Sequence, residues 1–168
     1  MKRLMRLLLF GILALCLKQC GYPQSSIEKT LDQLNKGSVP YIQPKEVQQD
    51  SALVLLDTRK KEEFEVSALP GAHWVGYQQF DLEEFKKQWP DKSTPVVVYC
   101  SVGVRSEDIG EVLMEAGYTQ VRNLYGGIFL WKNQDLPVVD SLQQQTQRVH
   151  AFDKRWGKLL TKGEKVYE

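Results

Sequence analysis

One short stretch of the sequence carries residues that can do nucleophilic chemistry. Cys100 is followed by Ser101 and Gly103, and Arg105 comes after four intervening residues. A cysteine thiolate is a strong nucleophile when positive charge and backbone N–H groups lower its pKa. Gly103 allows a tight turn of the backbone, and the Arg105 guanidinium can hold an oxyanion with two parallel hydrogen bonds. The pattern predicts a thiolate in a loop that binds anions.

The residues on either side of this stretch indicate a strand, a loop and a helix. Residues 95–99, Pro-Val-Val-Val-Tyr, are typical of a buried strand. Residues 107–116 have apolar side chains at the spacing of one helical face, and Gly117 is a stop signal. Cys100 is therefore expected at a strand end, facing a helix N-terminus that favours a thiolate. A cysteine there can also be a small buried hydrophobe, but the polar loop favours the anion site.

The rest of the chain alternates strand-like and helix-like segments. Strand–helix–strand units with short connections favour right-handed crossovers and parallel pairing. We therefore predict an α/β fold with a mainly parallel central sheet and helices on both faces. The predicted helices are 26–36, one from Pro44, 81–89 and a short one after Gly126-Gly127 that carries Trp131; the predicted strands are 39–43, 53–56, 72–75 and 121–124.

Four motifs together resemble the rhodanese (sulfurtransferase) family. They resemble its strand ending in Asp-x-Arg, its Pro-Gly-Ala turn, its active-site loop and its Gly-Gly segment before a tryptophan. One position departs, because Ala68 stands where the family often has histidine, and we expect this to affect packing more than chemistry. The motifs are Leu-Leu-Asp-Thr-Arg at 55–59, Leu-Pro-Gly-Ala at 69–72, Cys-Ser-Val-Gly-Val-Arg-Ser at 100–106 and Leu-Tyr-Gly-Gly-Ile-Phe-Leu-Trp at 124–131.

The resemblance implies a rhodanese-like fold and a sulfurtransferase or sulfur carrier. Cys100 would take a sulfane sulfur from thiosulfate or another persulfide donor, hold it as a persulfide and pass it to a thiol or protein acceptor. Arg105 would neutralise the oxyanion of the donor. The backbone N–H groups of the loop would bind substrate and stabilise the sulfur. These are the groups of Ser101, Val102, Gly103 and Val104.

Other polar residues receive smaller roles or none. Asp57 and Arg59 match the family's Asp-x-Arg and follow a predicted parallel strand, so we expect them to support the site or contact the substrate. His73 and His150 are too scattered to make a zinc site with the thiol, and no chemistry is assigned to them. No metal and no organic cofactor is implied.

Two other classes of function stay open. A cysteine phosphatase also uses a thiolate in an anion-binding loop, but its loop resembles Cys-x5-Arg, whereas this sequence has four residues between Cys100 and Arg105. The second alternative is a non-catalytic binding module that has kept the fold. The intact Cys100 and Arg105 argue against it.

Composition restricts the possible partners. The chain has 168 residues and a formal net charge of +1, from 22 basic and 21 acidic side chains. No global basic field therefore favours nucleic acid as a partner. Three cysteines, two of them at Cys16 and Cys20, are too few for a disulfide framework.

The first 20 residues resemble an export signal. Basic residues near the start precede an apolar run at 7–17, which is too short to span a bilayer comfortably. Leu-Lys-Gln-Cys at 17–20 faintly resembles a lipoprotein box, so lipidation of Cys20 could anchor the protein to a membrane. We predict an exported protein, periplasmic or a membrane-anchored lipoprotein; the alternative is a cytoplasmic protein with an uncleaved leader.

The C-terminal section, residues 137–168, differs in composition from the rest of the chain. Phe152, Trp156, Leu159 and Leu160 fall near helical spacing among basic residues. This favours an amphipathic segment packed on the domain over a basic aromatic surface for a membrane or nucleic acid. The predicted organisation is a leader at 1–20, an N-terminal helical extension at 21–38, a rhodanese-like domain at 39–137 and a packed C-terminal extension at 138–168.

Overall fold

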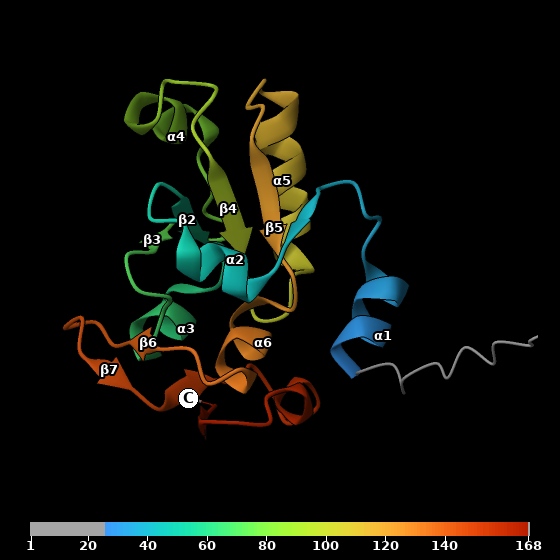
Figure 1. Ribbon diagram of the computed structural model, residues 1–168, viewed down its shortest axis with the longest axis vertical. Coiled ribbons are helices and arrows are strands. Elements are labelled where there is room, and N and C mark those ends of the chain that lie inside the picture. Colours follow the sequence, from blue (N-terminus) through green and yellow to red (C-terminus); the bar gives the residue numbers. More distant parts are fainter. Residues whose placement is uncertain (1–25, 168) are drawn as a thin grey trace, which may run out of the picture.

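A five-stranded parallel sheet forms the centre of the fold (Figure 1). The computed structural model describes residues 26–167. The strand order is β1-β5-β4-β2-β3, and every neighbouring pair is parallel, as predicted. The strands are β1 (Tyr41–Ile42), β2 (Val54–Asp57), β3 (His73–Trp74), β4 (Val96–Tyr99) and β5 (Val121–Leu124).

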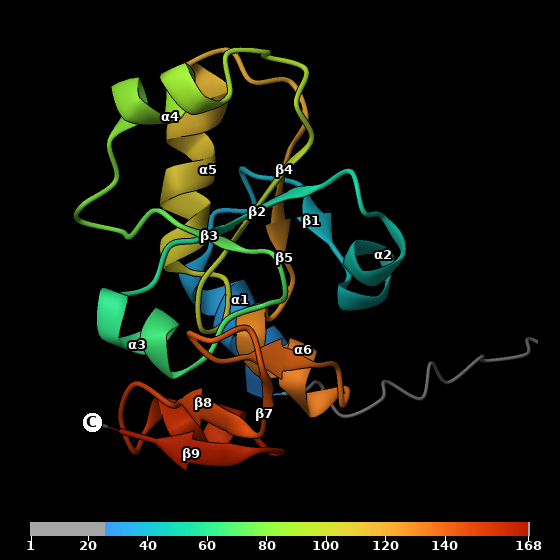
Figure 2. The same cartoon turned by 90° about the vertical axis from the view of Figure 1, so that its left-hand side faces the viewer.

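Helices cover both faces of the sheet, which confirms the predicted α/β class (Figure 2). The central strand β4 is buried along its whole length, and its side chains alternate between two apolar clusters. Val96 and Val98 pack with α4 (Leu82–Gln88) and α5 (Arg105–Glu115). On the other face, Val97 and Tyr99 pack with residues of α2 (Pro44–Gln49) and α6 (Gly127–Asn133).

Two further helices complete the helical part of the fold. The helix α1 (Ser26–Leu34) buries Ile27 and Leu31 in the cluster that contains Tyr99. The helix α3 (Lys61–Val66) was not predicted from the sequence. Six residues are too few to display a helical period, so α3 had no recognisable pattern.

The C-terminal segment does not form the α-helix that the near-helical spacing of its apolar residues favoured. β6 (Val138–Val139) pairs with β7 (Gln145–Thr146), and β8 (Arg148–His150) pairs in parallel with β9 (Glu164–Val166). A single 3₁₀ turn, η1 (Trp156–Leu159), lies between β8 and β9, while Phe152 lies in a loop with a positive φ of 65°. The helix expectation is therefore wrong, because tertiary contacts rather than a periodic face hold these side chains.

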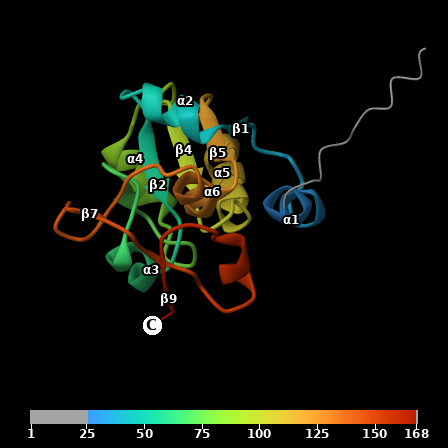
Figure 3. The same ribbon diagram turned by 60° about the horizontal axis from the view of Figure 1, so that its bottom comes forward.

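This segment gathers near the edge of the sheet where the parallel strands end (Figures 1 and 3). Its fully buried residues Val149, Ala151 and Leu160 belong to the same apolar cluster as Tyr99. The ends of parallel strands are where open α/β sheets place their sites. Within residues 26–167, no helix is long and apolar enough to cross a membrane. The predicted leader, with Cys20, lies outside the described residues.

Candidate active site

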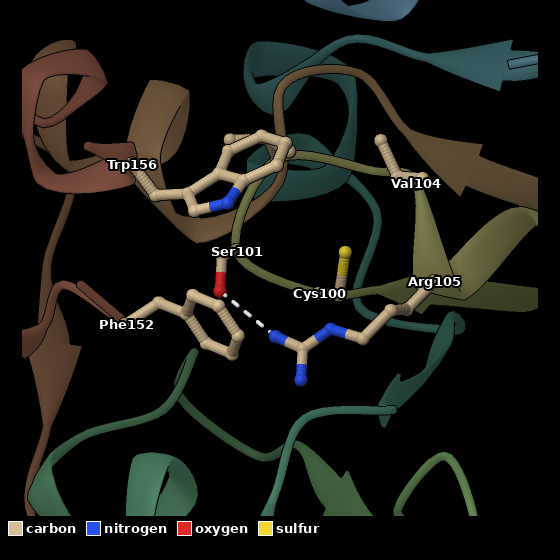
Figure 4. A pocket seen from close by; sticks show the side chains of 7 residues that line it. Cys100, Ser101, Val104, Arg105, Phe152 and Trp156 are labelled. Carbon is tan, nitrogen blue, oxygen red and sulfur yellow. Dashed lines mark hydrogen bonds between the residues drawn. The ribbon is translucent and has the colours of Figure 1, made fainter. Parts of the chain in front are cut away.

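Cys100 follows directly after β4 and lines a pocket at the carboxyl edge of the sheet (Figure 4). Its side chain is only 1% exposed. The Sγ atom accepts a hydrogen bond from the N–H of Gly103 at 3.1 Å. The helix α5 begins at Arg105, five positions later, so the predicted strand, loop and helix are present in that order.

The pKa of Cys100 lies below the ordinary value of a cysteine. Burial is the largest single influence and raises the pKa, because it removes the thiolate from water. The charge of Arg105 and hydrogen bonds from the N–H groups of Ser106, Gly103 and Val102 together outweigh this effect. The loop therefore favours the nucleophilic form of the sulfur.

Carbonyl groups of the loop accept hydrogen bonds from other parts of the fold, which fixes the backbone around the sulfur. The Gly103 carbonyl accepts hydrogen bonds from the side-chain amides of Asn35 and Asn123, each at 2.8 Å. Gly103 itself has a φ of +111°, a conformation that L side chains rarely adopt. The predicted requirement for glycine at this position is met in the structure.

The start of α6 holds the first two carbonyl groups of the loop. Ile128 N–H donates to the Cys100 carbonyl and Phe129 N–H to the Ser101 carbonyl, each at 3.0 Å. This close approach requires Gly127, since a Cβ atom there would lie 2.3 Å from the Cys100 carbonyl oxygen. The Gly-Gly segment is therefore part of the support of the cysteine loop.

Arg105 is held by an acidic residue that the sequence did not reveal. Its Nη1 and Nη2 donate to the two carboxylate oxygens of Glu63 at 2.9 and 3.0 Å. Ser101 Oγ also donates to Glu63, at 3.1 Å, and accepts from Arg105 Nη2 at the same distance. Both terminal nitrogens of Arg105 therefore donate to Glu63 in the structure, and the role of Arg105 in neutralising the oxyanion of the donor stays a prediction.

Glu63 is 1% exposed and remains ionised despite its burial. Burial raises its pKa, but hydrogen bonds and charge from Arg105, the charge of Arg59 and the Lys60 N–H bring the net value below the ordinary range. Glu63 lies in the first turn of α3, 42 positions before Arg105. No local pattern links residues so far apart, which explains why sequence reasoning missed it.

The pocket beside Cys100 has a volume of about 220 Å³ and mainly apolar walls. Of the predicted loop residues, Ser101, Val102, Val104 and Arg105 line it, while Gly103 is not a lining residue and acts through its N–H, which donates to Cys100 Sγ. Two further lining residues, Phe152 and Trp156, come from the C-terminal segment and were expected only to pack on the domain. Figure 4 shows both rings turned toward the pocket.

Asp57 and Arg59 form an ion pair inside the protein and do not line the pocket. Both side chains are fully buried, and Arg59 Nη2 lies 2.6 Å from Asp57 Oδ2. The same nitrogen donates to the Ser67 carbonyl at 2.6 Å, and the guanidinium lies 5.8 Å from the centre of the Tyr99 ring. The predicted contact with substrate is therefore corrected to support of Ser67 and Tyr99, the residue before Cys100.

The fold and the site together define an all-parallel α/β domain with a cysteine in an N–H-lined loop before a helix. A family model for the Rhodanese-like domain matches residues 43–134, more than half of the 168-residue chain. The chain belongs to the rhodanese-like domain family. This match confirms the family resemblance that the four sequence motifs indicated.

Named relatives within the family differ in what they do. The chain is 31% identical over 80 residues to the thiosulfate sulfurtransferase GlpE of Coxiella burnetii, a match covering 48% of this chain and 72% of that protein. It is 32% identical over 123 residues to the tRNA uridine(34) hydroxylase of Streptococcus thermophilus. That match covers 68% of this chain but only 36% of the hydroxylase.

Solved structures share the fold. The rhodanese-like domain of an Anabaena protein aligns with a TM-score of 0.55 and 20% identity, covering 62% of this chain and 82% of that one. The thiosulfate sulfurtransferase of Pseudomonas aeruginosa aligns with a TM-score of 0.56 and 25% identity, covering 73% of this chain and 23% of that one. The first of these likenesses concerns the fold alone.

Proposed function

We propose that this protein is a sulfurtransferase or sulfur carrier that holds a sulfane sulfur on Cys100. The observation that carries the proposal is the Cys100 Sγ at a pocket wall, with Gly103 N–H donating to it and its pKa lowered by Arg105 and the loop. The family and its thiosulfate sulfurtransferase relatives support the same chemistry. The donor is thiosulfate or a persulfide, and the acceptor is a thiol or a protein.

The proposed chemistry consists of two displacement steps on one sulfur. The Cys100 thiolate attacks the outer sulfur of the donor, and the bond from that sulfur to the rest of the donor breaks. The leaving group, sulfite or a thiolate, departs with the electron pair. An acceptor nucleophile then attacks the outer sulfur of the Cys100 persulfide and regenerates the thiolate. The N–H groups around Sγ stabilise the anion in both states.

A paired assay tests this proposal against its two alternatives. The protein is assayed for thiocyanate formation from cyanide with thiosulfate or glutathione persulfide as donor, and in parallel for hydrolysis of an aryl phosphate. We expect thiocyanate with at least one donor, loss of it in Cys100→Ser, and no phosphate release. Phosphate release that depends on Cys100 would assign a phosphatase, and inactivity in both assays would assign a binding module.

The proposed site of action is outside the cytoplasm. The basic and apolar residues at 1–20 motivate the proposal, with anchoring through a lipid on Cys20 or simple secretion as its two forms. The intact mass of the protein isolated from its native cell tests it. We expect a shortened or acylated N-terminus; an unmodified full-length chain would assign the protein to the cytoplasm.

A further inference from the structure

The C-terminal segment supplies one wall of the pocket beside Cys100. Phe152 and Trp156 line this pocket together with five residues of the cysteine loop. Figure 4 shows the two rings beside Cys100 and Arg105. Both lie beyond residues 43–134, the part of the chain that matches the family model. The two rings therefore come from a part of the chain outside the region that the family model matches.

Several contacts of the segment hold Phe152 in place. Its backbone has a φ of 65°, a left-handed conformation that is unusual for a bulky residue and persists only where the surroundings impose it. The Phe152 N–H donates to His150 Nδ1 at 3.1 Å, and His150 is fixed by the pairing of β8 with β9. The ring then lies 5.3 Å from the Arg105 guanidinium.

The backbone that carries Trp156 is also fixed. Asp153 Oδ1 accepts hydrogen bonds from the N–H groups of Arg155 and Trp156 at 2.7 and 2.8 Å. The Asp153 carbonyl accepts from Gly157 N–H at 2.8 Å. The pocket therefore has a preformed aromatic side, which reduces the entropy cost of binding an apolar group.

The charge around the pocket does not suit a dianion. Of the seven described residues that line it, Arg105 carries the positive charge, and Glu63 pairs with both of its terminal nitrogens. With Cys100 as a thiolate, Arg105, Glu63 and Cys100 sum to a net charge of −1. Thiosulfate, which carries two negative charges, would have to approach this group or displace the buried Glu63 carboxylate.

We infer that the site selects organic sulfane sulfur donors, in which the reacting sulfur is attached to an apolar body, over thiosulfate. Phe152 and Trp156 are its specificity-determining residues, because they contact that body. The inference rests on the proposed sulfur transfer through Cys100. With an organic persulfide, the Cys100 thiolate bonds to the outer sulfur, the donor S–S bond breaks, and the organic thiolate leaves with the electron pair; no oxidant is needed.

Three donors that share an outer sulfane sulfur differ in their charge and in the body attached to that sulfur. Thiosulfate is a dianion without an organic body, methanethiosulfonate is a monoanion with a methyl group, and benzenethiosulfonate is a monoanion with an aromatic ring. Each gives its outer sulfur to a thiolate and releases sulfite or a sulfinate. With cyanide as the common acceptor, kcat/KM for thiocyanate formation by the full chain compares them directly.

The expected order is benzenethiosulfonate, then methanethiosulfonate, then thiosulfate, with about tenfold or more between the first and the last. Phe152→Gly removes the ring at a backbone position that glycine tolerates, and Trp156→Leu keeps an apolar side chain. Each should lower kcat/KM for benzenethiosulfonate by about tenfold and for methanethiosulfonate by less than about threefold. Leu142→Ala, in the same segment but exposed and outside the pocket, is the control and should change neither value.

Two results would overturn the inference. Thiosulfate equal to or better than benzenethiosulfonate in the wild-type protein would show that charge and shape do not select the donor. Equal losses with all three donors in Phe152→Gly and Trp156→Leu would show that the rings only stabilise the fold. Both results leave sulfur transfer itself intact, whereas no thiocyanate from any donor and no sulfur on Cys100 would overturn the proposed function and this inference together.

Discussion

The reactivity of Cys100 depends on a balance between burial, which raises its pKa, and Arg105 with the loop N–H groups, which lower it. The net effect places the folded pKa of Cys100 below the ordinary value of a cysteine in the unfolded chain. The folded state therefore binds fewer protons at this site than the unfolded state between the two values. Its thiolate contributes stability that is fully present above the unfolded pKa and lost as pH falls through the folded pKa.

This balance predicts how stability depends on pH. The difference in free energy of unfolding between the wild-type protein and Cys100→Ser should increase with pH across that window and level off above about pH 8.5. Urea unfolding under reducing conditions, from roughly pH 5 to 9, measures it. A difference that does not change with pH would show that Cys100 titrates alike in the folded and unfolded chain.

A second prediction at the scale of single residues concerns Glu63. Glu63→Gln keeps the size of the side chain but removes the charge that offsets Arg105. The pKa of Cys100 should fall further, so the midpoint of iodoacetamide alkylation against pH should move to lower pH. The lost ion pair should also reduce the free energy of unfolding by about 1–3 kcal/mol.

A neighbouring acidic residue provides the control. Glu62→Gln removes the same charge from the same helix, at an exposed position without a hydrogen bond to Arg105. Its alkylation midpoint should match that of the wild-type protein. If Glu63→Gln also leaves the midpoint unchanged, Glu63 has no electrostatic effect on the sulfur and serves only the fold.

At the scale of elements, the cysteine loop is fixed by the start of α6. Gly127→Ala would place a Cβ atom 2.3 Å from the Cys100 carbonyl oxygen and 2.7 Å from two atoms of the Ser101 backbone. Backbone cannot give way as a flexible side chain can, so the loop must shift. Sulfur transfer should fall by about tenfold or more, since a displacement of about 1 Å at a reacting group can cost about 10²-fold.

A variant at a second glycine serves as a control. It separates the effect of the Cβ clash at Gly127 from the energetic cost of a left-handed backbone conformation. Gly71 has a φ of +75° and Gly127 a φ of +54°, but a Cβ atom at Gly71 would meet nothing within 4 Å. Gly71→Ala should therefore lose about 1–2 kcal/mol of stability from its left-handed conformation and keep its activity. Equal activity in the two variants, compared by kcat/KM, would contradict the role given to Gly127.

Some elements around the site could be predicted from the sequence, and others could not. The strand, loop and helix around Cys100 were predictable because their signals are local: an apolar β-branched run, a glycine and a helical stripe. Glu63 was not predictable, because α3 has six residues and its ion pair spans 42 positions. The residues Phe152 and Trp156 fall near helical spacing in the sequence. In the structure they line the pocket, in the segment between the paired strands β8 and β9, and they do not share an α-helix.

For the whole molecule, the C-terminal segment is part of the core as well as of the pocket. Val138, Val149 and Leu160 are fully buried in the cluster that also contains Tyr99 and Phe129. Full burial of a valine or leucine is worth about 1.5–3 kcal/mol. Three such residues amount to a large share of a net stability of about 5–15 kcal/mol.

A chain that ends at Pro137 should therefore fail to fold stably, although it contains the whole region matched by the family model. Circular dichroism and thermal unfolding compare it with the full chain. As a control, Leu142→Ala in the intact chain changes an exposed residue and should stay within about 0.5 kcal/mol of the wild-type protein. A truncated chain that unfolds cooperatively near the wild-type temperature would show that the segment is dispensable for the fold.

The mass of Cys100 after exposure to a sulfane sulfur donor tests the central claim most directly. The folded protein is incubated with benzenethiosulfonate or, separately, with thiosulfate, and the peptide that contains Cys100 is weighed. We predict an addition of about 32 Da, one sulfur atom, which cyanide removes as thiocyanate and which Cys100→Ser lacks. If both donors leave the Cys100 peptide at its original mass while the protein remains folded, Cys100 does not carry sulfur and the account is contradicted.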